Sequence, residues 1–444
     1  MSYADLSFWL FLALVLLGIA ALPLRLRPLW LIAASLWFYA APDPMRLLWL
    51  GGVTGAALVA LSVPAARKVT IVALVVLLVW AKFADALGLP DPGAPAGLSF
   101  YSFTAIALLA EALRRGESWG ALEATLHLVW FPKLLAGPIE RPQTLIPQVP
   151  ALSLRPGLAT LGFAFLLSGL VKKLVIADSL APTVDAAFAI PAHAAPVDLL
   201  LACYFFAFQI YCDFSGYADI AIGLSALVGL RLSRNFDRPY LSPTVAEFWS
   251  SRWHITLGQW FRDFVYIPLG GSRKGRARQV VNLMMVFLLS GLWHAGLGYG
   301  FGWGFVIWGL MNGALVVGEG FLPIPQSRLA RALRALLTFH LILVTWVFFR
   351  AASPADALTI LSRIAESLGQ LPGLIAAFPY TADHKLGLAL IAALLAVEMT
   401  TPRPLAERLT AAPLALRWTG FYAALALLLL MGRWQDTGFI YAGF

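Results

Sequence analysis

Charged residues are scarce in this chain. They make up 12% of its 444 residues, whereas hydrophobic residues make up 60%. A soluble globular domain carries roughly a quarter charged residues, so this composition excludes a protein whose main solvent is water. A bilayer span needs roughly 20 apolar residues, so we expect an all-α, polytopic integral membrane protein with about 11 to 12 transmembrane helices. Apolar runs recur throughout, at residues 6–22, 47–63, 69–80, 157–170, 280–292 and 421–431.

Cysteines and several catalytic motifs are also scarce or absent. The chain has only Cys203 and Cys212, whose spacing fits no zinc or redox motif, so we predict inert packing residues and no metal site. No Gly-x-Ser-x-Gly elbow, Walker loop, His-Glu-x-x-His helix or Gly-x-Gly-x-x-Gly turn is present, which leaves serine hydrolases, ATPases and zinc proteases without support. No repeat or long polar stretch divides the sequence, so we expect a single membrane domain over residues 1–444.

Basic residues outnumber acidic ones, with a formal net charge of +9. They are scattered between apolar runs rather than gathered on one polar domain, which argues against nucleic acid as a partner and for a membrane topology. Arg25 with Arg27, and Arg67 with Lys68, follow odd-numbered spans. The positive-inside rule therefore predicts an N-terminus outside the membrane and cytoplasmic basic clusters at residues 231–238, 273–278, 328–334 and 403–417.

Two segments do not fit simple spans. Residues 122–150 begin apolar but break at Phe131-Pro132 and at Gly137-Pro138, which predicts a re-entrant element buried in protein. Residues 248–268 alternate apolar and polar side chains, which predicts an amphipathic helix at the interface or dipping into it.

Two histidines are candidates for chemistry. His294 lies near the end of an apolar run, where an ionisable side chain is costly and therefore indicates a functional role. A neutral imidazole there can take a proton from a hydroxyl as that oxygen attacks a thioester, and the alternative is a core histidine hydrogen-bonded between helices. His254 follows Trp253 on the amphipathic segment, where the alternative is a polar face at the interface.

A polar cluster at residues 209–219 lies inside or beside a span. It includes Gln209, Asp213, Tyr217 and Asp219, which would be costly to place against lipid. The i, i+4 spacing puts Asp213 and Tyr217 on one helix face, which suits the wall of a polar tunnel. A satisfied hydrogen-bond network between helices explains the same pattern.

Characteristic motifs recur along the chain at residues 98–103, 131–141, 213–217, 247–257, 260–275, 291–294 and 439–441. In these motifs the sequence resembles the membrane-bound O-acyltransferase family, and within it the bacterial alginate O-acetyltransferase-like branch. The resemblance spans residue 98 to the C-terminus, and its family-like core is residues 98–320. Departures from the family pattern are Ala295-Gly296 after His294, Asn312 where a histidine is common, and Glu140 in place of an apolar residue.

The resemblance implies a fold and a site. The family fold is a bundle of membrane helices around a central tunnel. The histidines of its Leu-Trp-His and Arg-Trp-His motifs map onto His294 and His254, which we expect to be the catalytic residues. We expect the remaining site residues to bind substrate or to help place the thioester, namely Trp253, Asn235, Asp213, Tyr217, Gln209 and Trp293.

The resemblance also implies a function. We expect an O-acetyltransferase in the bacterial inner membrane, surrounded by lipid, with no permanently bound cofactor. It would take acetyl from a cytoplasmic thioester, either acetyl-coenzyme A or an acyl carrier. The acetyl would serve O-acetylation of an exported polysaccharide such as an alginate-like polymer, cellulose or peptidoglycan, through an extracytoplasmic partner protein with a catalytic serine. Two other hypotheses are a transporter of a lipid-linked or acetylated sugar and a non-catalytic scaffold of a secretion complex.

Overall fold

The structure is a computed structural model that describes residues 3–295, 302–323, 326–400, 403–434 and 438–440. Gly296 and Tyr441 of the motifs above lie outside these residues. The described chain is helical and contains no strand, as predicted. Its first helices are α1 (Leu6–Ala21), α2 (Arg27–Ala40), α3 (Arg46–Ser62), α4 (Arg67–Phe83), α5 (Leu98–Arg115), α6 (Ala121–Val129), α7 (Phe131–Leu134) and α8 (Pro142–Leu145).

The later helices include the longest one. They are α9 (Pro156–Leu170), α10 (Asp178–Ala189), α11 (Pro196–Leu227), α12 (Val245–Glu247), α13 (Ile255–Phe261), α14 (Arg276–His294), α15 (Trp303–Glu319), α16 (Arg328–Arg350), α17 (Pro354–Glu366), α18 (Leu371–Ala377), α19 (Ala382–Thr400), α20 (Leu405–Ala411) and α21 (Leu414–Met431). Three π-helical segments interrupt them, at Val171–Ala177, Phe248–Arg252 and Arg262–Tyr266.

Several of these helices are suited to cross a membrane. Within the described residues, five are long and apolar enough, and α19 with α20 would make a sixth. Three shorter apolar helices, α1, α3 and α15, accompany them. The protein is therefore a multi-pass membrane protein. The expected total of about 11 to 12 spans, the single domain and the outward N-terminus stay predictions.

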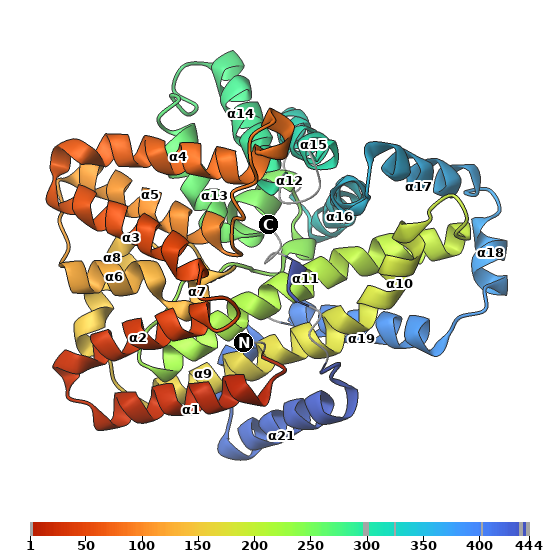
Figure 1. The fold of residues 1–444 in the computed structure, drawn as a ribbon. Coiled ribbons are helices and arrows are strands. Elements are labelled where there is room, and N and C mark those ends of the chain that lie inside the picture. The colour runs from red at the N-terminus through yellow and green to blue at the C-terminus, as the bar shows by residue number, and fades with distance from the viewer. Residues whose placement is uncertain (1–2, 296–301, 324–325, 401–402, 435–437, 441–444) are drawn as a thin grey trace.

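Helix α11 forms the centre of the molecule. Figure 1 shows it crossing the middle, with α1–α8 gathered on one side and α16–α18 on the other. Most of α11 is buried, whereas the most apolar parts of α4 and α21 are largely exposed. Exposed leucines and valines on the outer helices are what a lipid-facing surface requires, because lipid rather than water covers them.

Glycines let α9 and α11 approach each other closely. A Cβ at Gly162 would lie 2.7 Å from the Gly223 carbonyl oxygen, and one at Gly169 would lie 2.5 Å from the Gly216 carbonyl oxygen. The two pairs are two helical turns apart on both helices, which run in opposite directions. Small residues in such positions bring helix backbones together in membranes, where burying apolar surface gives no driving force between helices.

The segment from α6 to α8 matches the predicted re-entrant element. Its helices are short and broken at Trp130 and over residues 135–141. Almost all of it is buried, including the charged side chains of Lys133 and Glu140. The Glu140 carboxylate accepts hydrogen bonds from the backbone N–H and the hydroxyl of Ser233, so the departure at Glu140 has a structural partner.

The predicted amphipathic helix over residues 248–268 is wrong as one continuous helix. The segment bends at His254, whose φ of 44° is left-handed. The cause is non-local, because the backbone N–H of Ile255 donates to the Asn235 carbonyl (3.0 Å) instead of continuing the helix. The amphipathic pattern itself is confirmed, since Trp260 is buried and Arg262 is exposed. The bend turns His254 into the protein rather than along the interface.

Candidate active site

His294 ends α14 and is 3% exposed. Its Nδ1 lies 2.7 Å from the Ser290 carbonyl oxygen one turn earlier. A carbonyl oxygen only accepts, so Nδ1 carries the proton and the neutral ring keeps its lone pair on Nε2. Edge-to-face contacts with the rings of Trp308 (5.0 Å) and Phe349 (5.3 Å) hold the imidazole from two sides. The tautomer is therefore that of a proton acceptor at Nε2.

His254 also carries its proton on Nδ1, and here the side chain of Asn235 fixes this tautomer. The Asn235 side-chain oxygen accepts from the Thr256 backbone N–H (3.2 Å) and hydroxyl (2.9 Å), which identifies it as the oxygen of the amide. His254 Nδ1 lies 3.2 Å from that oxygen and donates to it. The imidazole also meets the Phe214 ring edge to face at 4.7 Å. Asn235 thus fixes both the backbone bend and the ring orientation of His254.

Trp293 lies between the two histidines. Its ring centre is 4.5 Å from that of His294 and 6.4 Å from that of His254. Phe103 of α5 stacks on it at 5.5 Å, and the ammonium of Lys82 at the end of α4 lies 5.9 Å from its ring centre. Neither Lys82 nor Phe103 carried a sequence-based role. The Trp293 indole is buried and contacts both imidazoles, but it does not line the cavity described next.

One cavity of about 330 Å³ contains both histidines. Two histidines that are 40 positions apart in the sequence therefore line one cavity, and their catalytic roles stay predictions. Trp253 also lines the cavity, and its role in substrate binding stays a prediction. The lining also includes Gln259, Arg262 and Tyr266, and the Arg262 side chain is 60% exposed. The cavity thus runs from the buried histidines toward a charged surface.

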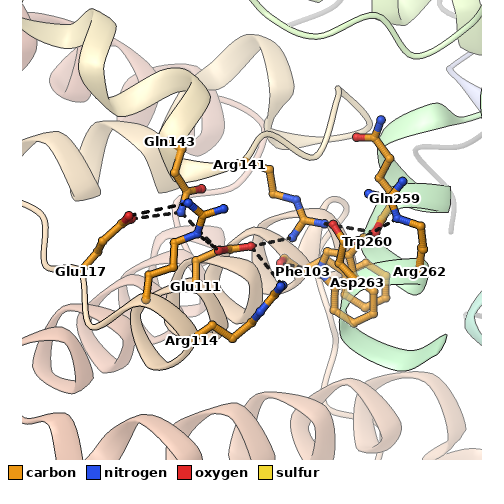
Figure 2. Close-up of polar contacts among 11 residues, drawn as sticks. Phe103, Glu111, Arg114, Glu117, Arg141, Gln143, Gln259, Trp260, Arg262 and Asp263 are labelled. Carbon is orange, nitrogen blue, oxygen red and sulfur yellow. Dashed lines mark hydrogen bonds and ion pairs between the residues drawn. The ribbon is translucent and has the colours of Figure 1, made fainter. Parts of the chain in front are cut away.

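A charged cluster secures this surface. Figure 2 shows Arg141, from the re-entrant element, between Glu111 of α5 and Asp263. Arg141 forms an ion pair of 2.8 Å with Asp263, lies 4.0 Å from Glu111, and donates to the Gln259 carbonyl oxygen at 3.2 Å. Its guanidinium also covers the Phe264 ring at 4.3 Å. Arg141 therefore ties two distant parts of the chain to the segment that lines the cavity.

The remaining predicted residues do not line this cavity. Asp213 accepts from Lys173 (2.8 Å) and from the Ile440 backbone N–H (2.9 Å), and Lys173 also pairs with Asp178 (3.0 Å). Tyr217 packs its ring against Tyr3 and Phe439, and Gln209 is buried. These contacts hold α11 to its neighbours. Trp293 and Asn235 also lie outside the lining of this cavity. Substrate-binding roles for all five residues stay predictions.

A second cavity of about 440 Å³ lies beside the first. Asn235 lines it, as do Lys172 and Asp219, which form an ion pair of 2.8 Å. Basic residues along it are already paired, Arg234 with Glu407 and Arg238 with Asp237. Within the described ranges, no three His, Cys, Asp or Glu side chains converge as metal ligands would.

Trp308 of α15 is a cavity residue for which the sequence indicated no role, and Asn312, noted above only as a departure from the family pattern, lies one turn after it. Trp308 lines the cavity and contacts His294, and Asn312, one turn later, accepts from the Trp249 indole N–H at 3.0 Å. Asn312 also donates to the Trp308 carbonyl oxygen at 2.8 Å. The i, i+4 spacing of a tryptophan and an amide was the available signal, but apolar helices contain tryptophans without any such role.

Known proteins resemble this chain in sequence. The profile of the MBOAT, membrane-bound O-acyltransferase family matches residues 62–350. A probable alginate O-acetylase AlgI of Azotobacter vinelandii is 39% identical over 265 residues, which are 58% of this chain and 51% of the relative. The corresponding Pseudomonas aeruginosa protein is 36% identical over 58% of this chain and 49% of its own length.

A peptidoglycan O-acetyltransferase of Helicobacter pylori is 37% identical over 247 residues, covering 54% of this chain and 46% of the relative. The chain thus spans about half the length of the curated relatives it matches. The family profile covers more than half of the chain and includes both histidines of the cavity. This protein belongs to the membrane-bound O-acyltransferase family.

Proposed function

We propose that this protein is an O-acetyltransferase that moves an acetyl group from a cytoplasmic thioester to a hydroxyl acceptor for the O-acetylation of an exported polysaccharide. The observation that carries the proposal is the shared cavity of His294 and His254. Both imidazoles donate from Nδ1 to a fixed oxygen, so both keep the lone pair of Nε2 for chemistry. Acyl transfer to a hydroxyl needs such a base, because a neutral hydroxyl is a weak nucleophile.

His294 acts as the general base in this mechanism. Its Nε2 takes the proton of the acceptor hydroxyl while that oxygen attacks the thioester carbonyl carbon. The carbon–sulfur bond then breaks, the acetyl group remains on the acceptor oxygen, and the imidazolium returns the proton to the leaving thiolate. The hydrogen bond from Nδ1 to Ser290 holds the ring in place through both proton transfers.

The donor enters at the charged end of the cavity. Arg262 and Gln259 lie there, on the side that the positive-inside rule places in the cytoplasm. A thioester carried by coenzyme A or by an acyl carrier brings phosphate groups, which suit an exposed guanidinium. His254, Asn235 and Trp253 place the acyl group, since Asn235 orients His254 and Trp253 lines the cavity beside it.

The identity of the acceptor polymer is inferred from the names of the related proteins. Their names concern alginate and peptidoglycan, two polymers outside the cytoplasm. The polymer served here is an exported glycan of this kind, alginate-like, cellulose or peptidoglycan, and the protein works in the bacterial inner membrane. The acetyl group reaches the polymer through an extracytoplasmic partner with a catalytic serine.

The test is acetyl transfer by the purified protein in lipid vesicles, with radiolabelled acetyl-coenzyme A or acetyl carrier protein, with and without candidate partners. His294→Ala should lower the rate by about 10²- to 10⁴-fold, the usual contribution of a general base. His340→Ala is the matched control, because His340 Nδ1 makes the same contact one turn back, to the Leu336 carbonyl oxygen (2.8 Å), but lies outside the cavity.

The outcomes separate the hypotheses. Label transfer that is lost in His294→Ala and kept in His340→Ala supports the enzyme and the role of His294. Equal transfer by all three proteins removes His294 as the base. Absence of transfer with every donor and partner, together with uptake of labelled sugar into the same vesicles, would establish the transporter in place of the enzyme.

A further inference from the structure

Trp308 presents a buried hydrogen-bond donor without an acceptor. Its side chain is 1% exposed, and its indole N–H has no hydrogen-bond partner among the described residues. The residue lines the cavity of the two histidines, with its ring centre 5.0 Å from that of His294. Buried donors in proteins are nearly always paired, because an unpaired one loses its hydration without compensation. We therefore looked for an acceptor that a bound substrate would bring to this unpaired donor beside the proposed general base.

The indole is held firmly in this position. Its ring stacks on Trp346 (5.8 Å, 19° between planes) and meets Phe349 edge to face at 5.2 Å. Its backbone carbonyl accepts a hydrogen bond from the side-chain NH₂ of Asn312, and the side-chain oxygen of Asn312 accepts one from the Trp249 indole. The surrounding contacts thus fix the ring without using its N–H. A donor held in this way is preorganised, since it need not move when its acceptor develops charge.

The two histidines leave a donor role unfilled. In the neutral tautomer that Ser290 and Asn235 impose, neither Nε2 carries a proton, so neither ring donates toward the cavity. Attack on a thioester moves the carbonyl electron pair onto its oxygen, and acyl-transfer sites stabilise that oxygen with N–H donors. Trp249 and Trp253 also line the cavity, and the Trp249 indole N–H is already donated to Asn312. The Trp293 indole N–H is likewise unpaired among the described residues, but Trp293 does not line the cavity, and of the cavity tryptophans only Trp308 contacts the His294 ring.

We propose that the Trp308 indole N–H donates a hydrogen bond to the thioester carbonyl oxygen as it becomes an oxyanion, which makes Trp308 a catalytic residue. The inference rests on the proposed acetyltransferase function. The acceptor oxygen bonds to the carbonyl carbon and the carbonyl electron pair moves to the oxygen, where it accepts from Trp308. That pair returns as the carbon–sulfur bond breaks, and the indole keeps its proton throughout.

The experiment compares Trp308→Phe with Trp346→Phe in the acetyl-transfer assay. Trp346 is the matched control because it is equally buried, belongs to the same stack and also has an unpaired indole N–H among the described residues, but does not line the cavity. We expect Trp308→Phe to lower kcat by about 10²- to 10³-fold, the usual effect of removing one oxyanion donor. The KM for the donor and the affinity for a non-reactive thioether analogue should stay unchanged. Trp346→Phe keeps an aromatic ring in the stack against Trp308 and should lower kcat much less than Trp308→Phe does.

A second replacement separates the N–H from the shape of the ring. Benzothienylalanine at position 308, introduced by nonsense suppression, keeps the two fused rings but has sulfur in place of the N–H. It should lower kcat as Trp308→Phe does while the protein melts at the wild-type temperature. This variant keeps the proposal testable if the phenylalanine variant fails to fold.

Three results would overturn the inference. A wild-type kcat in the benzothienylalanine protein would show that the N–H has no catalytic role. Equal losses of kcat in Trp308→Phe and Trp346→Phe would assign the effect to packing of the stack. Absence of transfer by the wild type with every donor and partner would remove the proposed function, and the inference with it, whereas transfer that depends on His294 but not on Trp308 would remove only the inference.

Discussion

The glycine contact between α9 and α11 gives the sharpest prediction about stability. In Gly169→Ala the new Cβ would lie 2.5 Å from the Gly216 carbonyl oxygen and 2.8 Å from the Ile220 backbone nitrogen. Ordinary contacts begin at 3.4 Å, so the backbones must separate by about 3.4 − 2.5 = 0.9 Å. These two obstacles are backbone atoms that no rotamer change moves, and the side-chain Cγ1 atom of Ile220 also lies 2.7 Å from the new Cβ. We expect a loss of about 1–3 kcal/mol in the free energy of unfolding, toward the upper end of the range for overpacking.

The measurement is reversible unfolding in mixed detergent micelles, followed by near-UV circular dichroism. Gly157→Ala is the control, because it lies on the same helix and a Cβ there meets nothing within 4 Å. That variant should be neutral or more stable, since alanine favours helix by about 1 kcal/mol over glycine. The double variant Gly169→Ala with Gly216→Ala should lose less than the sum of the single losses, because the first substitution already separates the helices.

The reasoning fails if Gly169→Ala unfolds at the same denaturant concentration as Gly157→Ala. Full additivity in the double variant would also contradict it, because independent effects would mean that the two glycines do not share one contact. A Gly169→Ala protein that is less stable but equally active would leave the prediction intact, since it concerns helix packing and not the cavity.

Three further predictions concern polar contacts. Asn235→Ala removes the oxygen that accepts from His254 and should lower the free energy of unfolding by about 1–3 kcal/mol, the cost of a buried donor without an acceptor, and reduce kcat for acetyl transfer. Arg141→Gln should destabilise by about 3 kcal/mol, the lower end of the range for breaking a buried ion pair, because its side chain is 17% exposed. Lys173→Met leaves the Asp213 carboxylate buried without its cation and should cost about 3–5 kcal/mol in an unfolding measurement.

Each of these has a matched control. Asn235→Asp keeps an acceptor oxygen and should retain more activity than Asn235→Ala, and the opposite order would contradict the proposed contact. Arg114→Gln removes a guanidinium that is 51% exposed from the same charged cluster and should cost less than about 1 kcal/mol. Lys274→Met changes an exposed lysine and should be neutral. Equal losses for Arg141 and Arg114, or for Lys173 and Lys274, would refute the assigned ion pairs.

Many of the helices could be predicted from the sequence, because a long run of apolar residues is enough to indicate a membrane helix. The run at residues 6–22 corresponds to α1, and the run at 47–63 corresponds to α3. The breaks around Pro132 and Pro138 also appear where proline removes a backbone donor. These features depend on residues close together in the chain, and their physical causes are local.

The candidate site was predictable only in part. The histidine motifs identified His294 and His254, and the structure places both on one cavity. The bend at His254 could not be predicted, because it depends on hydrogen bonds to Asn235, which is 19 positions away. The position of Trp308 beside His294 depends on how α14 and α15 pack, and no local sequence pattern indicates this packing. Non-local contacts therefore mark the limit of the sequence-based prediction.

The Arg141 cluster has a consequence for how this protein is made. Arg141 and Asp263 are 122 residues apart, and chains grow at about 5–20 residues per second, so Asp263 follows Arg141 from the ribosome by roughly 6–24 s. During that interval Arg141 lacks Asp263, whereas Glu111, its other acidic neighbour at 4.0 Å, has already been synthesised. The contacts that hold the re-entrant element to the segment lining the cavity therefore form only after Gln259 and Asp263 have emerged.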